Sequence, residues 1–274
     1  MTPRIFILFC CILLSRLSYS QADSTFHFVR DYRGSITDFT VDNLGNMYLL
    51  YQNGQLKKLR PNGDSLAVFN NVRKFGRLHA VDVSNPLKVL LHFKDFNTVV
   101  VLDRMLNERT VLDLRKFNLL QVKAIGQSYD NNIWIYDELD ARLKKIGDDG
   151  RLIDQSNDFR QIFDTTPSPS VIIDQDKLVY MYDDQRGMYT FDYYGGFKNR
   201  IPFTGWRDFA VIEHFVFGRD SSYFYRYDTG TLDVQQLEVP RFMNDAQKIV
   251  IRPGNVYLLR DGVLMVYSYG VKTF

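Results

Sequence analysis

The chain of 274 residues contains only two cysteines, Cys10 and Cys11, and both lie within its first twenty residues. The rest of the sequence therefore has no thiol for nucleophilic catalysis, for a disulfide or for a soft metal ion. Histidine is also scarce, at four residues: His27, His79, His92 and His214. No two of them have the spacing of zinc ligands, so the sequence predicts no histidine-based metal site.

The motifs of common enzyme classes are missing as well. There is no G-x-S-x-G elbow for a nucleophilic serine, and Gly195-Gly196 is not followed by the Lys-Ser/Thr pair of a phosphate-binding loop. We therefore expect no cofactor and no enzymatic activity. Carboxylates that converge only in the folded chain stay open as the alternative, a hydrolase or lyase acting on sugars or lactones.

Three acidic turns could suggest calcium: Asp42–Asn46, Asp148–Gly150 and Asp183–Gly187. None has carboxylates at alternate positions followed by a terminal glutamate, as a calcium loop requires. Because Asp, Asn and Gly also favour turns for backbone reasons, these segments predict turns and no metal site. Calcium would be possible only through convergence of several loops.

The N-terminus has the order of a secretory signal peptide. Arg4 precedes the apolar run from Ile5 to Leu14, and smaller and polar residues follow up to Ser20. The run has about ten residues, whereas a helix that spans a bilayer needs about twenty. We therefore expect cleavage before Gln21 and a mature chain without a membrane span, located in the periplasm; a short N-terminal anchor is the alternative.

Charge of one sign does not dominate either. Removal of residues 1–20 would take away Arg4 and Arg16 and leave 32 basic and 32 acidic residues. A chain without net charge has no overall field that attracts nucleic acid. Hydrophobic residues make up 45% of the composition, which is enough for one substantial core, and we expect residues 21–274 to form a single domain.

A repeated unit of strands and turns is what the sequence does have. The clearest copy runs from Ile36 to Phe69, with turns at Asn43–Asn46, Gln52–Gly54 and Pro61–Asp64. Asn-Gly pairs supply the positive φ of tight hairpins, and alternating apolar residues between them indicate half-buried strands. The copy therefore predicts a four-stranded antiparallel meander.

Five later segments follow the same plan: His79 to Leu112, Val122 to Ile153, Ser170 to Pro202, Asp208 to Val239, and Gln247 to Phe274. Leu56-Lys57-Lys58-Leu59 in the first copy is echoed by Leu143-Lys144-Lys145-Ile146 in the third. About forty residues with four strands is the size of a propeller blade. The sequence predicts an all-β propeller of about six blades, with five or seven as alternatives, and no helix of useful length.

A second echo concerns the way the ring closes. Val29–Tyr32, Val72–Phe75 and Leu114–Phe117 share a pattern and each precede the first strand of a copy. Phe26 to Arg30 then has no blade of its own, so we expect it to be the outer strand of the last blade. Closure of this kind removes the exposed edges that an open array would leave.

The segment from Val83 to Asp103, VSNPLKVLLHFKDFNTVVVLD, is more distinctive than a propeller requires. It resembles a motif of an exported β-propeller family of Bacteroidota, which includes the plug subunit of the type IX secretion translocon. The resemblance implies a non-enzymatic periplasmic protein that docks on an outer-membrane complex, as a structural or gating subunit. No binding residue of the family is carried over to this chain.

Candidate interface residues come from turns and from aromatic side chains. Asn85 and Pro86 lie in one predicted turn, and Lys94, Asp95, Phe96 and Asn97 lie in another. Trp206 and Arg207 are candidates because Trp and Arg are frequent anchors of protein interfaces. The alternative for both turns is ordinary turn chemistry, and for most aromatic residues it is packing between blades. An exposed aromatic platform, which a carbohydrate- or peptidoglycan-binding module would need, cannot be placed from sequence.

Overall fold

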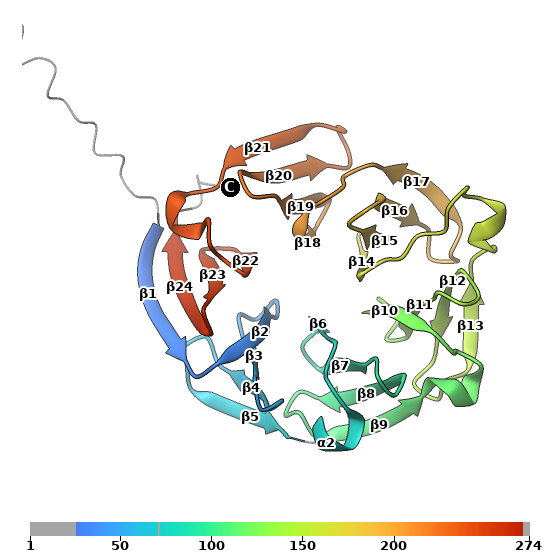
Figure 1. The fold of residues 1–274 in the computed structure, drawn as a ribbon, viewed down its shortest axis with the longest axis horizontal. Helices are drawn as coiled ribbons and strands as arrows, with labels where there is room; N and C mark the ends of the chain where they lie inside the picture. Colours follow the sequence, from blue (N-terminus) through green and yellow to red (C-terminus); the bar gives the residue numbers. More distant parts are fainter. Residues whose placement is uncertain (1–25, 71, 271–274) are drawn as a thin grey trace, which may run out of the picture.

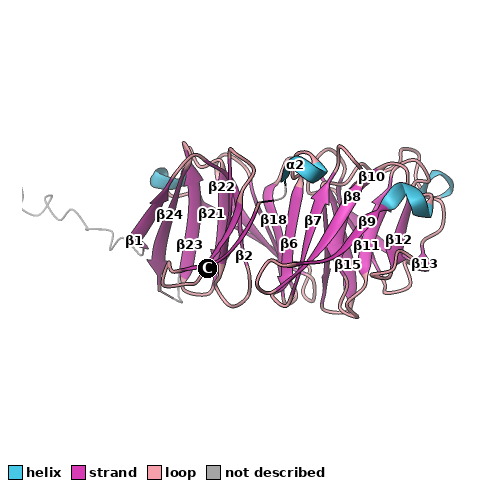
Figure 2. Ribbon diagram, turned by 90° about the horizontal axis from the view of Figure 1, so that it is seen from below, coloured by secondary structure: helices cyan, strands magenta, loops and turns pink. Residues whose placement is uncertain are grey.

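Six antiparallel sheets form a closed ring in the computed structural model, which describes residues 26–70 and 72–270 (Figure 1). Each sheet has four strands, so the predicted all-β propeller is confirmed and the number of blades is six. Seen from the side, the ring is a flat disc with the strands crossing its thickness (Figure 2). The predicted leader lies outside the described residues.

The blades follow one another along the chain, each starting at the axis and ending at the rim (Figure 1). Blades 1 to 3 contain β2 (Ile36–Val41), β3 (Met47–Tyr51), β4 (Leu56–Leu59), β5 (Ser65–Phe69), β6 (Ala80–Asn85), β7 (Lys88–Phe93), β8 (Thr98–Asp103), β9 (Glu108–Asp113), β10 (Val122–Gln127), β11 (Ile133–Asp137), β12 (Arg142–Ile146) and β13 (Leu152–Gln155). Blades 4 to 6 contain β14 (Val171–Gln175), β15 (Leu178–Asp183), β16 (Gly187–Phe191), β17 (Phe197–Ile201), β18 (Arg207–Ile212), β19 (Phe215–Arg219), β20 (Tyr223–Asp228), β21 (Val234–Glu238), β22 (Lys248–Arg252), β23 (Asn255–Arg260) and β24 (Val263–Tyr269).

The N-terminal strand completes the last blade, as the sequence predicts. β1 (Phe26–Arg33) pairs antiparallel with β24, and the sheet order is β1-β24-β23-β22. The register joins Phe26 to Tyr269 and Arg33 to Val263, so the strand runs three residues beyond the predicted Arg30. In Figure 1 the first and last strands of the chain lie side by side. The ring is therefore held shut by backbone hydrogen bonds between its two ends.

Alternation along each strand divides its apolar side chains between two blade interfaces. In β3, Met47 and Leu49 belong to the cluster shared with blade 6, whereas Tyr48 belongs to the cluster shared with blade 2. Six such clusters separate the six blades. A strand with neighbours on both faces is buried along its length. Full burial of a Leu or Met side chain stabilises the folded state by about 1.5–3 kcal/mol.

The repeated Lys-Lys pair of blades 1 and 3 has a structural role. Lys58 Nζ donates a hydrogen bond to the Arg104 carbonyl of blade 2 (3.0 Å) and lies 4.8 Å from the centre of the Tyr48 ring. Lys145 Nζ donates to the Tyr193 carbonyl of blade 4 (3.2 Å) and lies 5.0 Å from the Trp134 ring. In both cases a buried ammonium group crosses from one blade to a turn of the next. We call this contact the lysine brace.

In residues 26–70 and 72–270, helical segments are confined to the connections between blades, and each has three or four residues. They are α2 (Val72–Phe75), η1 (Leu114–Phe117), η2 (Phe159–Gln161) and η3 (Arg241–Met243). Val29–Tyr32 shares a sequence pattern with two of these helices but not their structure. It lies inside strand β1, whereas the other two copies of the pattern are short helices. Within the described residues, no helix has the length and apolar character needed to cross a membrane.

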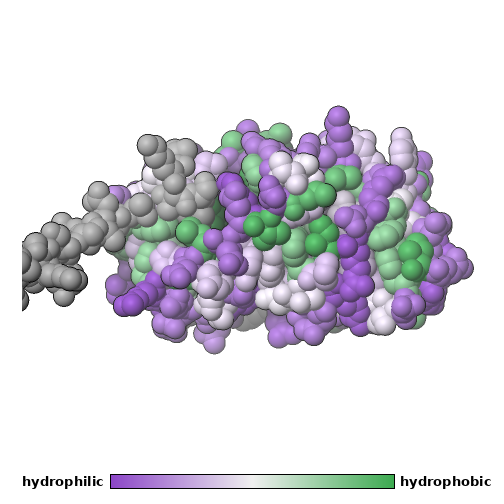
Figure 3. Space-filling model, turned by 90° about the horizontal axis from the view of Figure 1, so that it is seen from above, coloured by the Kyte–Doolittle hydropathy of each residue, from purple (hydrophilic) through white to green (hydrophobic). Residues whose placement is uncertain are grey.

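The rim of the disc is made by the outermost strand of each blade. All five residues of β21 are exposed, including Val234 (50%) and Leu237 (45%). Viewed from the side of blade 5, hydrophobic patches on the rim are interrupted by hydrophilic side chains (Figure 3). Interspersed polar residues of this kind discourage edge-to-edge pairing of outer strands.

His92 is a buried histidine without a hydrogen-bond partner among the described residues. It lies in β7 with no exposed surface, and neither ring nitrogen is bonded. Burial, with smaller contributions from His79 and Lys94, lowers the pKa of His92 to about 3. The folded protein therefore keeps this ring neutral at pH values where the unfolded chain protonates it.

The pH dependence of stability follows from that difference. Between the unfolded pKa of His92, about 6.5, and the folded value of about 3, the unfolded state binds one more proton, so lowering the pH destabilises the fold. We expect His92→Leu to be more stable than the wild type, by about 1–3 kcal/mol near neutral pH. The difference in unfolding free energy between His92→Leu and the wild type should grow by up to about 1.4 kcal/mol per pH unit below 6.5. Urea unfolding at several pH values measures this difference. A difference that stays the same at every pH would contradict the prediction.

Candidate functional site

The two faces of the disc differ in which turns they carry. The top face is the one at which the innermost strand of each blade begins. It also carries the turn between the second and third strands of each blade. On the bottom face, the innermost strand ends. In blade 2 the turn after β7 is therefore on top and the turn before it is at the bottom. The short helices lie along the top in Figure 2.

Asn85 and Pro86 lie at the bottom face, in the turn between β6 and β7. Both are half-buried, and Leu87 beside them is 63% exposed. Asn85 Nδ2 donates to Asn131 Oδ1 of blade 3 (3.0 Å), and its Oδ1 accepts from the Leu87 amide (3.0 Å). The side chain of Asn85 thus shapes its own turn and joins two blades.

The turn Lys94–Asn97 lies on the opposite face. Lys94, Asp95 and Phe96 are exposed, with Phe96 at 48%, whereas Asn97 is buried. Asn97 adopts a positive φ of 49°, and its Nδ2 donates to the Leu119 carbonyl (2.5 Å). The two predicted turns of blade 2 are therefore separated by the thickness of the disc and cannot belong to one flat interface.

Trp206 and Arg207 lie at the top of blade 5. The Trp206 ring is only 7% exposed, because it is stacked between Phe203 and Tyr225, with ring centres 4.3 and 5.0 Å away. In the isolated chain, the Trp206 ring packs between blades 4 and 5. Arg207 is exposed, and its guanidinium donates weakly to the Asp220 carbonyl (3.4 Å).

Three exposed apolar residues lie on segments that hydrogen bonds join on the top of blades 2 and 3. Phe96 (48%), Leu120 (55%) and Leu139 (54%) form what we call the top-face patch. The Asn97 bond to Leu119 ties the segments of Phe96 and Leu120. Gln121 Nε2 donates to Glu138 Oε2 (2.6 Å), and the Glu138 amide donates to the Gln121 carbonyl (2.9 Å), which ties in Leu139.

Basic side chains lie beside this patch. Burial and the positive charges of Lys94, Lys123 and Arg77 lower the pKa of the neighbouring His79. Acidic side chains lie there as well, since Asp95 acts on His79 in the opposite direction and Glu138 directly precedes Leu139. Such a surface fits a partner that offers apolar pockets with charged groups of both signs at their edge.

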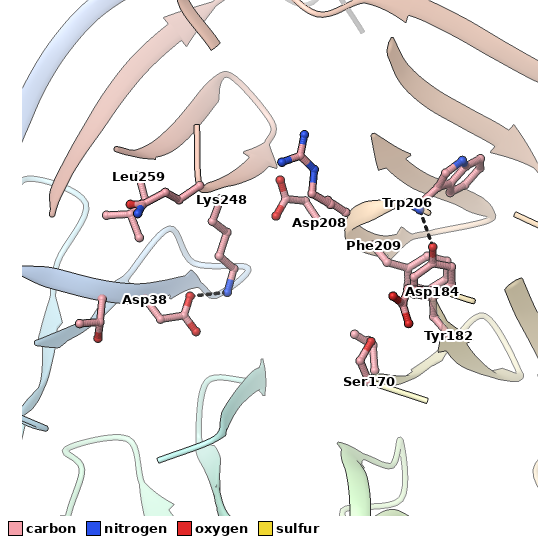
Figure 4. A pocket seen from close by; sticks show the side chains of 13 residues that line it. Asp38, Ser170, Tyr182, Asp184, Trp206, Asp208, Phe209, Lys248 and Leu259 are labelled. Atoms are coloured by element: carbon pink, nitrogen blue, oxygen red, sulfur yellow. Dashed lines mark hydrogen bonds and ion pairs between the residues drawn. The ribbon is translucent and has the colours of Figure 1, made fainter. Parts of the chain in front are cut away.

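A cavity of about 350 Å³ opens at the top end of the central axis (Figure 4). Its walls come from blades 1, 4, 5 and 6, and three aspartates from different blades line it: Asp38, Asp184 and Asp208. Two of them are already paired. Lys248 Nζ lies 2.7 Å from Asp38 Oδ1, and Arg219 Nε lies 2.5 Å from Asp208 Oδ2.

Asp208 is the most unusual residue of this cavity. Its backbone has a positive φ of 55°, in the irregular part of β18 where the register shifts. Burial raises the pKa of its carboxyl, and the Arg219 charge opposes that rise. Strained backbone and a buried carboxyl beside a cavity are both features that concentrate at functional sites.

The acidic turns use their carboxylates on their own backbone. Asp42 Oδ1 accepts from the Leu44 and Asn46 amides, Asp149 accepts from the Arg151 amide, and Asp183 accepts from the Gln185 amide. Within residues 26–70 and 72–270, no group of three or more His, Cys, Asp or Glu side chains could hold a metal ion. These contacts are those expected of turn residues.

Sequence reasoning missed Leu120, Leu139 and Asp208. Nothing in the sequence near Leu120 or Leu139 marks a surface, because their proximity to Phe96 depends on hydrogen bonds between three segments. Asp208 stands at the start of a predicted blade, and only the fold shows that this position faces the axis.

No family model and no curated protein matches this chain. Similar solved structures include a streptogramin B lyase, 13% identical, with a TM-score of 0.59 over 85% of this chain and 78% of that one. An inactive virginiamycin B lyase from Staphylococcus aureus with quinupristin is 12% identical, with a TM-score of 0.57 and 90% of both chains covered.

A third similar structure is PorZ, a surface component of the type-IX secretion system of Porphyromonas gingivalis. It is 10% identical, with a TM-score of 0.57 over 87% of this chain and 33% of that one. Identities this low show the fold alone. The chain is thus similar in fold to proteins that include both enzymes and a secretion component.

Proposed function

We propose that the chain is a non-enzymatic periplasmic protein that docks on an outer-membrane complex, as a structural or gating subunit like the plug of the type IX translocon. The observation that carries the proposal is the top-face patch of Phe96, Leu120 and Leu139. These side chains are exposed at about half of their surface although hydrogen bonds fix their segments. A surface ordered before binding loses little entropy when a partner docks.

Two further observations support it. The distinctive segment from Val83 to Asp103 spans β6 to β8 and includes the turn that carries Phe96. The fold is also similar to that of PorZ, a component of a type IX secretion system. Neither gives a partner by itself, so the test must identify one.

Co-purification from detergent-solubilised envelope tests the docking. We expect the tagged wild type to bring down a large outer-membrane protein. Phe96→Asp should reduce its recovery at least about tenfold, because loss of a buried aromatic anchor typically costs about 2 kcal/mol or more. Quantitative mass spectrometry after crosslinking in cells gives the measurement.

Leu232→Asp is the matched control. Leu232 is 66% exposed in the turn after β20, at the bottom of blade 5, so the charge is added away from the top-face patch. Equal loss in both variants would place the effect outside the patch. Recovery of the wild type only as a free monomer would refute the docking function itself.

The second candidate is a hydrolase or lyase acting on sugars or lactones. The axial cavity favours it, through the buried and strained Asp208 and the aspartates contributed by two other blades. The ion pairs of Asp38 and Asp208 weigh against it, since a paired carboxylate is a poor base. Turnover of a lactone or an acidic oligosaccharide that disappears in Asp208→Asn would favour this candidate over the first.

A further inference from the structure

Two stacked tyrosines, the exposed Tyr129 and the half-buried Tyr193, lie on the bottom face where blades 3 and 4 meet. Tyr129 lies in the turn after β10 and Tyr193 in the turn after β16, and their ring centres are 4.3 Å apart at an angle of 27°. Tyr129 is 62% exposed, and the adjacent Tyr194 is 76% exposed. We call these three residues the tyrosine platform.

Both turns that carry the platform are fixed by contacts from the opposite blade. Asp174 of blade 4 accepts from the Tyr129 amide (3.2 Å), and also from Ser128 Oγ (3.1 Å) and Trp134 Nε1 (3.0 Å). In return, the lysine brace from Lys145 of blade 3 reaches the Tyr193 carbonyl. The backbone of both turns is therefore held in place before any ligand arrives, and the stacking of Tyr129 on Tyr193 joins the two turns.

The corresponding turns of blades 1 and 2 show that the brace does not need the tyrosines. By their backbone hydrogen bonds, the turn Asp42–Asn46 matches Ser128–Asn132, and Asp103–Asn107 matches Asp192–Gly196. Asn43 and Arg104 then occupy the positions of Tyr129 and Tyr193. Lys58 braces that interface in the same way, without an aromatic pair. Joining blades thus does not account for the exposed rings.

Most carboxylates around the platform have a partner within the protein. Asp130 is paired with Lys145 (3.3 Å), and Asp174 accepts three donors on one oxygen. Asp176 and Lys177 are exposed neighbours of opposite sign in the turn before β15. The groups named here leave an excess of one carboxylate, which disfavours an anionic ligand, while the aromatic rings offer stacking and hydrogen bonds.

We propose that the tyrosine platform binds an uncharged saccharide, with the apolar face of a sugar ring stacked on Tyr129 and Tyr194. Sugar hydroxyls would bond to polar groups at its edge, among them the exposed Asp176 carboxylate. The site lies on the face opposite the top-face patch, so it acts independently of the docking function. A protein with both surfaces holds an envelope complex on one side and a neutral glycan on the other.

Titration calorimetry with chitotetraose, maltotetraose and cellotetraose tests the proposal on the full mature chain. We expect at least one of them to bind with a Kd of about 1 mM or tighter, as is reasonable for a shallow site. Tyr129→Ala and Tyr194→Ala should each weaken binding about tenfold, whereas Tyr129→Phe should retain it because the ring remains. Met105→Ala, in the matching turn of blade 2, should leave binding unchanged.

Three outcomes would overturn the proposal. One is that no tetrasaccharide binds the wild type at a concentration well above the expected Kd. Another is that Tyr129→Ala, folded as judged by its melting curve, binds as well as the wild type. The third is that Tyr129→Ala loses a co-purified envelope protein while no saccharide binds, which would make the platform a protein-docking site. Failure of Phe96→Asp to affect co-purification bears only on the top-face patch.

Discussion

A chain that begins at Gly34 should lose cooperative unfolding, whereas a chain that begins at Phe26 should melt like the full protein. The shorter chain lacks β1, so the backbone of β24 is left as an open edge from Val263 to Tyr269. It also loses Tyr32, which packs against the cluster between blades 6 and 1. We expect a loss comparable to the whole net stability of a domain, about 5–15 kcal/mol.

Circular dichroism during heating and limited proteolysis measure this effect. A synthetic peptide of Phe26–Arg33 provides the strictest check, because a peptide that adds as an outer strand should restore resistance to protease. If the chain from Gly34 melts cooperatively within a few degrees of the control, closure by β1 is not what holds the ring together.

Gly126→Ala should be strongly destabilising, because the added methyl group meets the backbone of a neighbouring blade. An added Cβ at Gly126 in β10 would lie 2.5 Å from the Ile172 carbonyl oxygen in β14 and 3.0 Å from its carbon. Both strands line the axis, and the obstructing atoms are backbone, so relief requires blades 3 and 4 to move apart. We expect a loss of about 3 kcal/mol, at the upper end of overpacking effects.

Gly230→Ala is the matched control for this change. Gly230 is exposed in the turn after β20, and the nearest atom to its added Cβ is the side-chain Oδ1 of Asp228, at 3.3 Å. Urea unfolding should separate the two variants clearly. If Gly126→Ala is no worse than Gly230→Ala, the two inner strands do not approach as closely as described.

The fold was predictable because its information is local. Asn-Gly turns and alternating residues between Ile36 and Phe69 are enough to define one blade, and the same pattern recurs five times. Even the closing strand could be found, since Phe26 to Arg30 had no other place in the repeat. The ends of strands were less predictable. β1 continues to Arg33 because β24 offers it a backbone partner that far along the strand.

The candidate surfaces were predictable only in part. Exposure of Phe96 follows from its place in a tight turn, which the sequence shows. The burial of Trp206 does not, because it depends on Gly218 of the adjacent strand: an added Cβ there would lie 2.4 Å from the Trp206 ring. The pairing of Tyr129 with Tyr193 also joins two blades, and one sequence does not reveal which turns meet.

The composite last blade also constrains when the protein can fold. Phe26 is made near the start of the chain, yet its partner Tyr269 lies near the other end. Blades 1 to 5 can form from contiguous sequence, whereas the cluster between blades 6 and 1 must wait for β22 to β24. Pairing over so long a separation is slow, so we expect the final closing step to limit the folding rate. A chain emerging N-terminus first would remain an open arc, with both end sheets unpaired, until its last few strands appeared.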